Sequence, residues 1–191
     1  MTEQRRNLLI VVLGAVLLIA VAALIEHGTG RPSLGPGGQF ALWSNDVSTS
    51  EQSRSFADPF SLSHVTHGFL FFLLILLVAR RLPVRYRFLC ALLLEVGWEL
   101  LENSPFLIHR YQTATVSTTY LGDSVLNSMG DVLMMVGGFL IASRLRPWVN
   151  AIIIVAIELF MLLWIRDNIT IDTIMLIHPI EAIKAWQSAG M

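Results

Sequence analysis

The chain has 191 residues, of which 54% are hydrophobic and 14% are charged, whereas an ordinary soluble domain carries about 25% charged residues. The 13 Lys and Arg residues nearly balance the 14 Asp and Glu residues, which excludes the strong positive charge of a typical nucleic-acid-binding protein. The single cysteine, Cys90, excludes an intrachain disulfide and a zinc site built from several thiolates. Together these features predict one domain over residues 1–191, an all-α integral membrane protein.

Five apolar stretches are long enough to cross a bilayer, whose hydrocarbon core of about 30 Å needs about 20 residues of helix. They lie at residues 8–25, 64–79, 88–108, 123–142 and 148–165. We therefore predict a bundle of about five transmembrane helices. The first stretch also has features of a signal peptide, with two arginines before it and an Ala-Val-Ala motif at residues 20–22. Because its apolar run continues past that motif to Ile25, we predict an uncleaved anchor.

Arginines gather in the short segments on one side of the predicted bundle. These arginines are Arg5, Arg6, Arg80, Arg81, Arg85, Arg87, Arg144 and Arg146. Because short cytoplasmic segments are enriched in Lys and Arg, we predict that the N-terminus lies inside and the C-terminus outside. The outer side then holds loops at residues 26–63 and 104–122 and a tail at residues 166–191. Residues 174–186 of the tail alternate apolar and polar side chains at roughly helical spacing, which predicts a short interfacial helix.

Three glutamates in the third stretch lie on one face of the predicted helix. Glu95, Glu99 and Glu102 are four and three residues apart, which places them on a common face at 3.6 residues per turn. Each charged side chain costs about 2.5 to 3.5 kcal/mol at the centre of a membrane helix. Protonation, a metal ion, a basic partner or a water-filled cavity must therefore compensate them. For Glu95, the deepest, we predict a hydrogen bond to another helix.

Ionisable residues of four stretches have a similar predicted depth. Counting 1.5 Å per helical residue from the nearest cytoplasmic arginine places Glu99 and Glu158 at about 18 Å. His67 and Asp131 lie at about 20 Å on the same count. A second layer, nearer the outside, consists of Glu102, His64 and Asn127, with Asp123 above them. The sequence therefore predicts a polar cavity that opens towards the outside.

Two histidines offer a metal site in this cavity. His64 and His67 are one helical turn apart, a separation at which two imidazoles can bind one ion. Carboxylates of Glu99, Asp131 and Glu158 would complete a shell suited to a divalent metal such as Zn, Fe or Mn. In the alternative interpretation, the two histidines hydrogen-bond a neighbouring glutamate and no metal binds.

The same residues supply candidate catalytic groups. Glu102 is the candidate general base, and Glu99 and Asp131 are the candidate catalytic carboxylates beside the metal. Acids of this kind are also typical of a proton relay in a carrier, so they do not separate an enzyme from a transporter.

Polar residues near the outer mouth predict a site for the headgroup of a substrate. These residues are Arg110, Arg166, Asp123 and Asn127. Arginine binds phosphate and other anions through paired hydrogen bonds. The alternative is that the two arginines only anchor the chain at the membrane surface.

Several motifs carry a resemblance to a known family. They are His64-x-x-His67-Gly68, residues 95–104 (EVGWELLENS), residues 122–131 (GDSVLNSMGD), and Arg166-Asp167-Asn168 with residues 178–181 (HPIE). Over about residues 43–186, the sequence resembles an uncharacterised family of bacterial multi-pass inner-membrane proteins, some of which are labelled phosphatidylserine synthase. The run Asp-x-x-Asp-Gly-x-x-Ala-Arg that alcohol phosphatidyltransferases need is absent from the sequence. The resemblance therefore implies location in the bacterial cell inner membrane and the topology above, but no chemistry.

The leading hypothesis is a metal-assisted enzyme, embedded in the membrane, that acts on a lipid or lipid-linked substrate. Its partners are then the lipid bilayer and that substrate, without nucleic acid. A second hypothesis is a non-catalytic assembly or scaffold protein in which the polar cluster specifies helix packing. A third is a proton-coupled carrier, which is less favoured because the sequence lacks the inverted repeat common in transporters.

Overall fold

The computed structural model describes residues 2–49 and 51–189 of the chain. These residues form eight α-helices and one short 3-10 helix. The helices are α1 (Glu3–Gly28), η1 (Pro36–Gly38), α2 (Ser61–Val78), α3 (Val84–Glu102), α4 (Pro105–Ala114), α5 (Val125–Ala142), α6 (Pro147–Trp164), α7 (Ile169–Ile177) and α8 (Glu181–Ser188). The one β-pairing among the described residues is an isolated bridge between Trp43 and Ala57. The predicted all-α fold is therefore confirmed.

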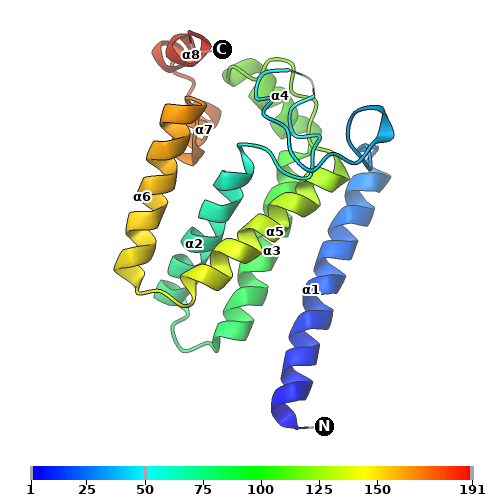
Figure 1. The fold of residues 1–191 in the computed structure, drawn as a ribbon, viewed down its shortest axis with the longest axis vertical. Helices are drawn as coiled ribbons and strands as arrows, with labels where there is room; N and C mark the ends of the chain where they lie inside the picture. Colours follow the sequence, from blue (N-terminus) through cyan, green and yellow to red (C-terminus); the bar gives the residue numbers. More distant parts are fainter. Residues whose placement is uncertain (1, 50, 190–191) are drawn as a thin grey trace.

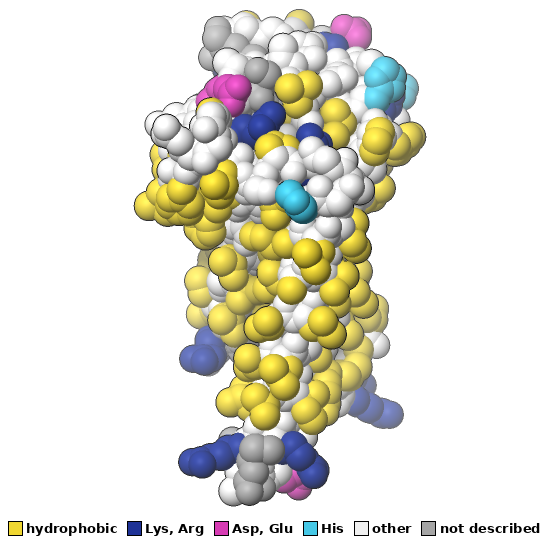
Figure 2. Space-filling model, turned by 90° about the vertical axis from the view of Figure 1, so that its right-hand side faces the viewer, with side chains coloured by type: hydrophobic (Ala, Val, Ile, Leu, Met, Phe, Trp, Pro, Cys, Tyr) yellow, Lys and Arg dark blue, Asp and Glu magenta, His cyan; other side chains and the backbone are white. Residues whose placement is uncertain are grey.

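Five long helices, α1, α2, α3, α5 and α6, run between two ends of the molecule (Figure 1). One end, here called the arginine end, contains the start of α1 and the turns at residues 79–83 and 143–146. The other, here called the loop end, contains residues 29–49 and 51–60, α4, α7 and α8. Figure 2 shows a belt of hydrophobic side chains between the two ends, with Lys and Arg side chains at its lower margin. The N-terminus lies at the arginine end and the C-terminus at the loop end.

Four of these helices are long and apolar enough to cross a membrane. They are α1 from Arg5 onwards, α2, α5 and α6. The helix α3 is 19 residues long and runs beside them, but its two arginines and three glutamates make it more polar. The described helices thus have the length and composition expected of an all-α membrane protein.

The third predicted stretch ends at Glu102 rather than at residue 108, which agrees with the predicted start of the outer loop at residue 104. Ser104 is extended (φ −74°, ψ 149°), and its side chain accepts a hydrogen bond from the Leu107 N–H, which starts α4 at Pro105. Proline disfavours a helical residue before it and is well tolerated in the first turn of a new helix. The predicted outer loop at residues 104–122 therefore begins with a separate helix.

The tail forms two helices instead of the single one predicted at residues 174–186. The first, α7, ends at Ile177, and α8 begins at Glu181. Pro179 explains the break, because it disfavours a helical conformation of His178, which is extended (φ −141°, ψ 93°). The Gln187 side chain of α8 donates a hydrogen bond to the Arg166 carbonyl oxygen, so α8 is held against the end of α6.

Helices α2 and α5 cross closely because glycines lie at their contact. A Cβ placed on Gly68 would lie 2.3 Å from the carbonyl oxygen of Met135, and one on Gly138 would lie 2.2 Å from that of Val65. In a membrane, small residues allow this approach, and packing then stabilises the pair. The buried core beside the crossing includes Phe69, Phe72, Leu92, Val132 and Phe139.

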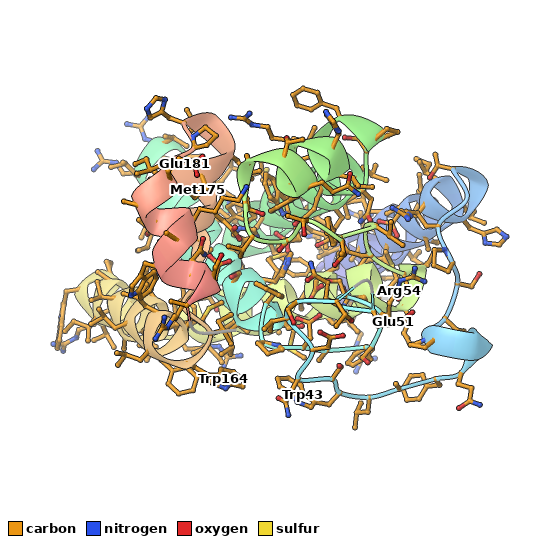
Figure 3. All side chains as sticks on the ribbon, turned by 90° about the horizontal axis from the view of Figure 1, so that it is seen from above. Trp43, Glu51, Arg54, Trp164, Met175 and Glu181 are labelled. Atoms are coloured by element: carbon orange, nitrogen blue, oxygen red, sulfur yellow. The ribbon has the colours of Figure 1, made fainter. Side chains whose placement is uncertain are left out.

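The connection between α1 and α2 packs on the loop end. Trp43 stacks on Trp164 at the end of α6, with ring centroids 6.3 Å apart and planes 2° from parallel (Figure 3). The Asn127 side chain donates a hydrogen bond of 2.8 Å to the carbonyl oxygen of Ser55. These contacts hold the connection against α5 and α6.

Candidate functional site

A cavity of about 150 Å³ lies at the loop end between α2, α3, α4 and α7. Its ionisable lining includes His64, His67, Glu102, Asp123, Asp131, Asp167 and Asp172. Five carboxyl groups thus share the cavity with two imidazoles. Such an excess of acids requires either protonation or a bound cation.

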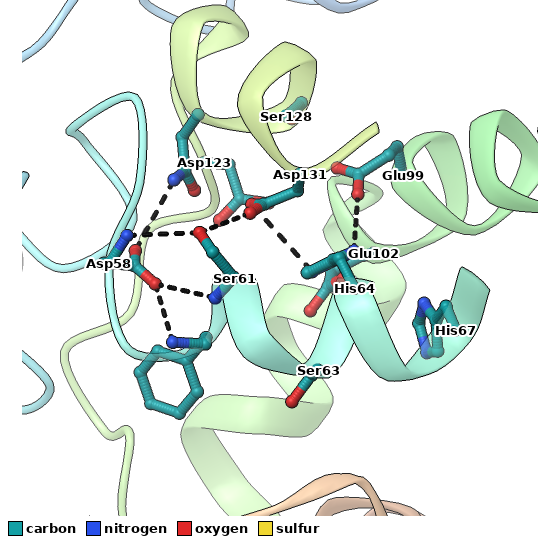
Figure 4. Close-up of polar contacts among 12 residues, drawn as sticks. Asp58, Ser61, Ser63, His64, His67, Glu99, Glu102, Asp123, Ser128 and Asp131 are labelled. Carbon is teal, nitrogen blue, oxygen red and sulfur yellow. Dashed lines mark hydrogen bonds and ion pairs between the residues drawn. The ribbon is translucent and has the colours of Figure 1, made fainter. Parts of the chain in front are cut away.

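Two histidines of α2 meet one glutamate of α3 beside this cavity. The Nδ1 atom of His64 lies 2.6 Å from Glu95 Oε1, and the Nδ1 atom of His67 lies 3.0 Å from Glu95 Oε2. Two more carboxylates flank His64: Glu99 Oε1 lies 3.2 Å from Nδ1, and Asp131 Oδ2 lies 3.8 Å from Nε2 (Figure 4). We call these five residues the His–Glu cluster.

Glu99 is the least compensated member of the cluster. Glu95 and Glu99 are both 0% exposed, but Glu95 is hydrogen-bonded to both histidines. Neither oxygen of Glu99 has a hydrogen-bond partner among the described residues. A buried carboxylate costs several kcal/mol unless it is paired, neutralised or bound to a cation. Glu99 therefore marks the position in the cluster where a proton or a metal ion stabilises the structure most.

Two sets of three side chains have the spacing of metal ligands. In each set, one ligand atom per residue lies within 4.8 Å of the others, and the sets are His64, His67 and Glu95, and His64, Glu99 and Glu102. In the first set, an ion would replace the hydrogen bonds to Glu95. The second set already has oxygens without partners in the described structure, on Glu99 and at Oε2 of Glu102. It therefore fits a divalent ion better, with one imidazole and two carboxylates as ligands.

Glu102 lines the cavity, as its predicted role of general base requires. Its Oε1 atom accepts a hydrogen bond of 2.9 Å from the hydroxyl of Tyr111 on α4. This bond orients the carboxylate, so that Oε2 is the atom available to an ion or a proton.

Asp131 is held on the opposite side of His64 by the start of α2. Its Oδ1 atom accepts a hydrogen bond of 2.6 Å from the Ser61 hydroxyl. That hydroxyl oxygen in turn accepts one of 3.1 Å from the N–H of Asp58, and burial raises the pKa of Asp58 to about 6. Ser61 thus fixes the carboxylate of Asp131 beside His64.

Asp123 and Asn127, predicted to bind a headgroup, lie in a network that holds the loop end together. The carboxylate of Asp123 accepts hydrogen bonds from Tyr120 (2.8 Å) and from the Asn103 side chain (2.9 Å). The Asp123 N–H donates to Asn103 Oδ1 over 2.7 Å. Burial raises the pKa of Asp123. Asp123 lines the cavity, whereas Asn127 is buried with its amide bonded to Ser55.

The contacts of Glu158 lie at α7 and not in the His–Glu cluster. Its Oε2 atom accepts hydrogen bonds from the Thr170 N–H (3.1 Å) and hydroxyl (2.7 Å). A carboxylate is favourable there, because Thr170 lies in the first turn of α7. The depth count used to predict Glu158 carries no information on the direction in which a side chain points around the helix axis.

Arg110 and Arg166, the other predicted headgroup residues, bind backbone carbonyl groups of the tail. Arg110 Nε donates a hydrogen bond of 2.7 Å to the Leu176 carbonyl oxygen. Arg166 Nη1 donates one of 2.8 Å to the Trp186 carbonyl oxygen, and its guanidinium lies 5.4 Å from the Trp186 ring centroid. Both arginines therefore fix α7 and α8 over the cavity.

Three site residues were missed by sequence reasoning. The predicted hydrogen bond of Glu95 to another helix is confirmed by its contacts with His64 and His67, but Glu95 was not counted among the site residues, although its place on the same face as Glu99 was a usable signal. Asp167 and Asp172 line the cavity, and burial raises the pKa of Asp167 to about 7 and also raises that of Asp172. The sequence carried no signal for these two, because only the fold of the tail brings them to the cavity.

The comparisons with known proteins identify bacterial relatives that align with this chain over about nine-tenths of both lengths. A UPF0314 protein of Sphingopyxis alaskensis is 43% identical over 176 residues, which cover 92% of this chain and 94% of the relative. A UPF0314 protein of Rhizobium etli is 45% identical over 174 residues (91% and 89%), and one of Paracoccus denitrificans is 41% identical over 173 residues (91% and 90%). No solved structure matches the chain.

A family model described as "Protein of unknown function (DUF2585)" matches residues 26–189. This range contains every motif on which the predicted resemblance rested, and the relatives named above are bacterial. The predicted resemblance to an uncharacterised bacterial family is confirmed, and the chain belongs to the DUF2585 family.

Proposed function

We propose that the chain is a metal-dependent enzyme of the bacterial cell inner membrane that acts on a lipid or lipid-linked substrate. The observation that carries this proposal is the carboxylate of Glu99, which is fully buried and 3.2 Å from His64 Nδ1. A divalent ion bound by His64, Glu99 and Glu102 would neutralise this carboxylate and the excess of acids around it.

The proposal includes five transmembrane helices. The polar helix α3 crosses the membrane beside the four apolar helices. It can do so because its buried Glu95 and Glu99 face the bundle interior and not lipid. The arginine end lies in the cytoplasm by the positive-inside rule. The cavity then lies at the outer side of the membrane, within reach of the outer leaflet.

The residues around the ion site have different proposed roles. A divalent ion held by His64, Glu99 and Glu102 would supply a Lewis acid. Because the Tyr111 hydroxyl holds Oε1, Oε2 is the one free oxygen of Glu102, and Glu102 would act as the general base when Oε2 is not bound to the ion. Asp131 is held by Ser61 and faces Nε2 of His64. It would orient the imidazole, as carboxylates that contact a metal-binding histidine do in other metal sites.

Elemental analysis of the purified full-length chain tests this proposal. We expect stoichiometric Zn, Fe or Mn, and a loss of metal affinity of at least about tenfold in His64→Ala and in Glu99→Gln. The matched control is Glu181→Gln on α8, which removes an exposed carboxyl group away from the cavity and should retain the metal. A wild-type protein that takes up none of the three metals, even on titration, would contradict the proposal.

A non-catalytic scaffold is the second candidate, and the direct pairing of His64 and His67 with Glu95 favours it. These hydrogen bonds join α2 to α3 without an ion. If the wild-type chain is metal-free and Glu95→Gln lowers its thermal stability in detergent, the cluster serves helix packing instead.

A further inference from the structure

A shallow apolar groove lies on the surface between α2 and α3. It is lined by Phe71, Leu93, Leu94, Gly97 and Leu101, together with His67 and Trp98. We call it the α2–α3 groove. Leu93, Leu94 and Leu101 are 58%, 45% and 48% exposed. In a membrane-spanning bundle, these side chains face the hydrocarbon of the bilayer.

The groove and the acidic cavity share two residues, His67 and Trp98. The His67 ring stacks on Phe71 of the groove, with centroids 5.3 Å apart, and meets the edge of Trp98 at 5.9 Å. On its other side, His67 Nδ1 lies 3.0 Å from Glu95. The imidazole of His67 therefore belongs both to the lipid-facing groove and to the His–Glu cluster.

The polar lining residues of the groove lie towards the loop end, as the headgroup of a lipid in that leaflet does. His67 lies nearer the loop end than Phe71 on α2, and Trp98 lies nearer the loop end than Leu93 on α3. From Leu93 to Leu101 the groove extends about 12 Å along the helix, at 1.5 Å per residue. The two polar lining residues, His67 and Trp98, thus lie at the level of the cavity, next to Leu101, whereas Phe71 and Leu93 lie towards the middle of the bilayer.

We propose that the α2–α3 groove binds one hydrocarbon chain of a membrane lipid whose headgroup reaches the cavity past His67 and Trp98. This inference rests on the proposed function and names the route by which its substrate arrives. The lipid enters sideways from the leaflet at the loop end. Its hydrocarbon chain packs against leucine side chains, and its headgroup would reach the ion site at His64, Glu99 and Glu102.

Gly97 offers a direct way to block the groove. A Cβ placed on Gly97 meets no atom within 4 Å, so a side chain there starts in open space at the floor of the groove. Gly137 on α5 has the same property and is not part of the groove. Gly97→Trp and Gly137→Trp are therefore matched variants.

Photo-crosslinking in vesicles tests the groove. The full-length chain is reconstituted in phosphatidylethanolamine and phosphatidylglycerol with a trace of phosphatidylethanolamine that carries a diazirine on one acyl chain. Crosslinked peptides are then located by mass spectrometry. We expect labelling concentrated at residues 93–101 and reduced at least about tenfold by Gly97→Trp, as the loss of about two buried methylene contacts predicts. The Gly137→Trp variant should be labelled by the lipid to the same extent as the wild type.

Two results would overturn the inference. One is labelling spread evenly over the lipid-facing sides of α1, α6 and the groove, as for lipid that only coats the surface. The other is labelling at residues 93–101 that Gly97→Trp leaves unchanged. The metal content of each variant is measured in parallel. Concentrated, Gly97-dependent labelling of a metal-free wild type would support the groove while it contradicts the proposed enzyme, so the two failures are distinguishable.

Discussion

Asp167 lies where α6 ends and the tail turns over the cavity. It is 6% exposed, and its Oδ1 atom accepts a hydrogen bond of 2.9 Å from the Asn168 N–H. Burial raises the pKa of Asp167 from 3.8 to about 7. Asp172 and Glu158 are the nearby acids, and Asp167 itself contributes to the raised pKa of Asp172. The tail therefore depends on a carboxyl group that is more easily protonated when folded than when unfolded.

This raised pKa predicts that the protein loses stability as the pH rises from about 4 to about 7. In that window the folded state binds more protons than the unfolded state, so the free energy of unfolding falls, by up to about 1.4 kcal/mol per pH unit for one group. Above the folded pKa the contribution becomes constant. Thermal unfolding in detergent between pH 4 and pH 8 measures this slope. Asp167→Asn should have a shallower slope, and equal slopes for both proteins would contradict the prediction.

At the scale of elements, the crossing of α2 and α5 determines the geometry of the site. His64 lies one turn before Gly68 on α2, and Asp131 lies one turn before Met135 on α5. Because Gly68 packs directly on the Met135 carbonyl group, the distance between His64 and Asp131 depends on the absence of a side chain at residue 68.

We predict that Gly68→Ala destabilises the protein by about 1 to 3 kcal/mol, the usual cost of overpacking a tight contact. The added methyl group would meet backbone atoms of α5, which cannot move aside as a flexible side chain does. Thermal unfolding in detergent checks this value. Gly137→Ala is the control, because its Cβ meets no atom within 4 Å. Equal stabilities of the two variants would show that the helices are not closely packed at Gly68.

At the scale of the whole molecule, the arginine end and the loop end differ in charge and structure, which predicts the orientation in the membrane. Arginines at residues 80–87 and 144–146 lie in the short turns of one end and in the first turn of α3, as expected for cytoplasmic segments. The cavity, α4, α7 and α8 lie at the other end (Figure 1).

Single-cysteine labelling tests this orientation. In a Cys90→Ala background, Ser188→Cys on α8 should react with a maleimide that does not cross the inner membrane, because it lies outside. Arg81→Cys should react only after the membrane is permeabilised. Both positions are exposed, so accessibility in the folded protein does not limit either reaction. The reverse pattern would place the cavity in the cytoplasm and exclude entry of a lipid from the outer leaflet.

Much of the local structure was predictable from residues close together in the sequence. Apolar runs predicted the long helices to within a few residues at most ends, and the spacing of Glu95, Glu99 and Glu102 predicted that they share a face. The early end of α3 and the break in the tail depend on Pro105 and Pro179, whose effect on the preceding residue is local. These two corrections therefore required no knowledge of the tertiary structure.

The sequence by itself determined that the chain is helical and apolar, that its arginines mark one end, and that acids and histidines lie towards the other. These properties follow from composition and from the period of the helix. Only the tertiary structure decided that Glu95 joins His64 to His67, that Glu158 pairs with Thr170 instead, and that Asp167 and Asp172 reach the cavity. The physical reason is that a helical period gives the height and the shared face of side chains, whereas the rotation of one helix against another depends on packing, here on Gly68 and Gly138.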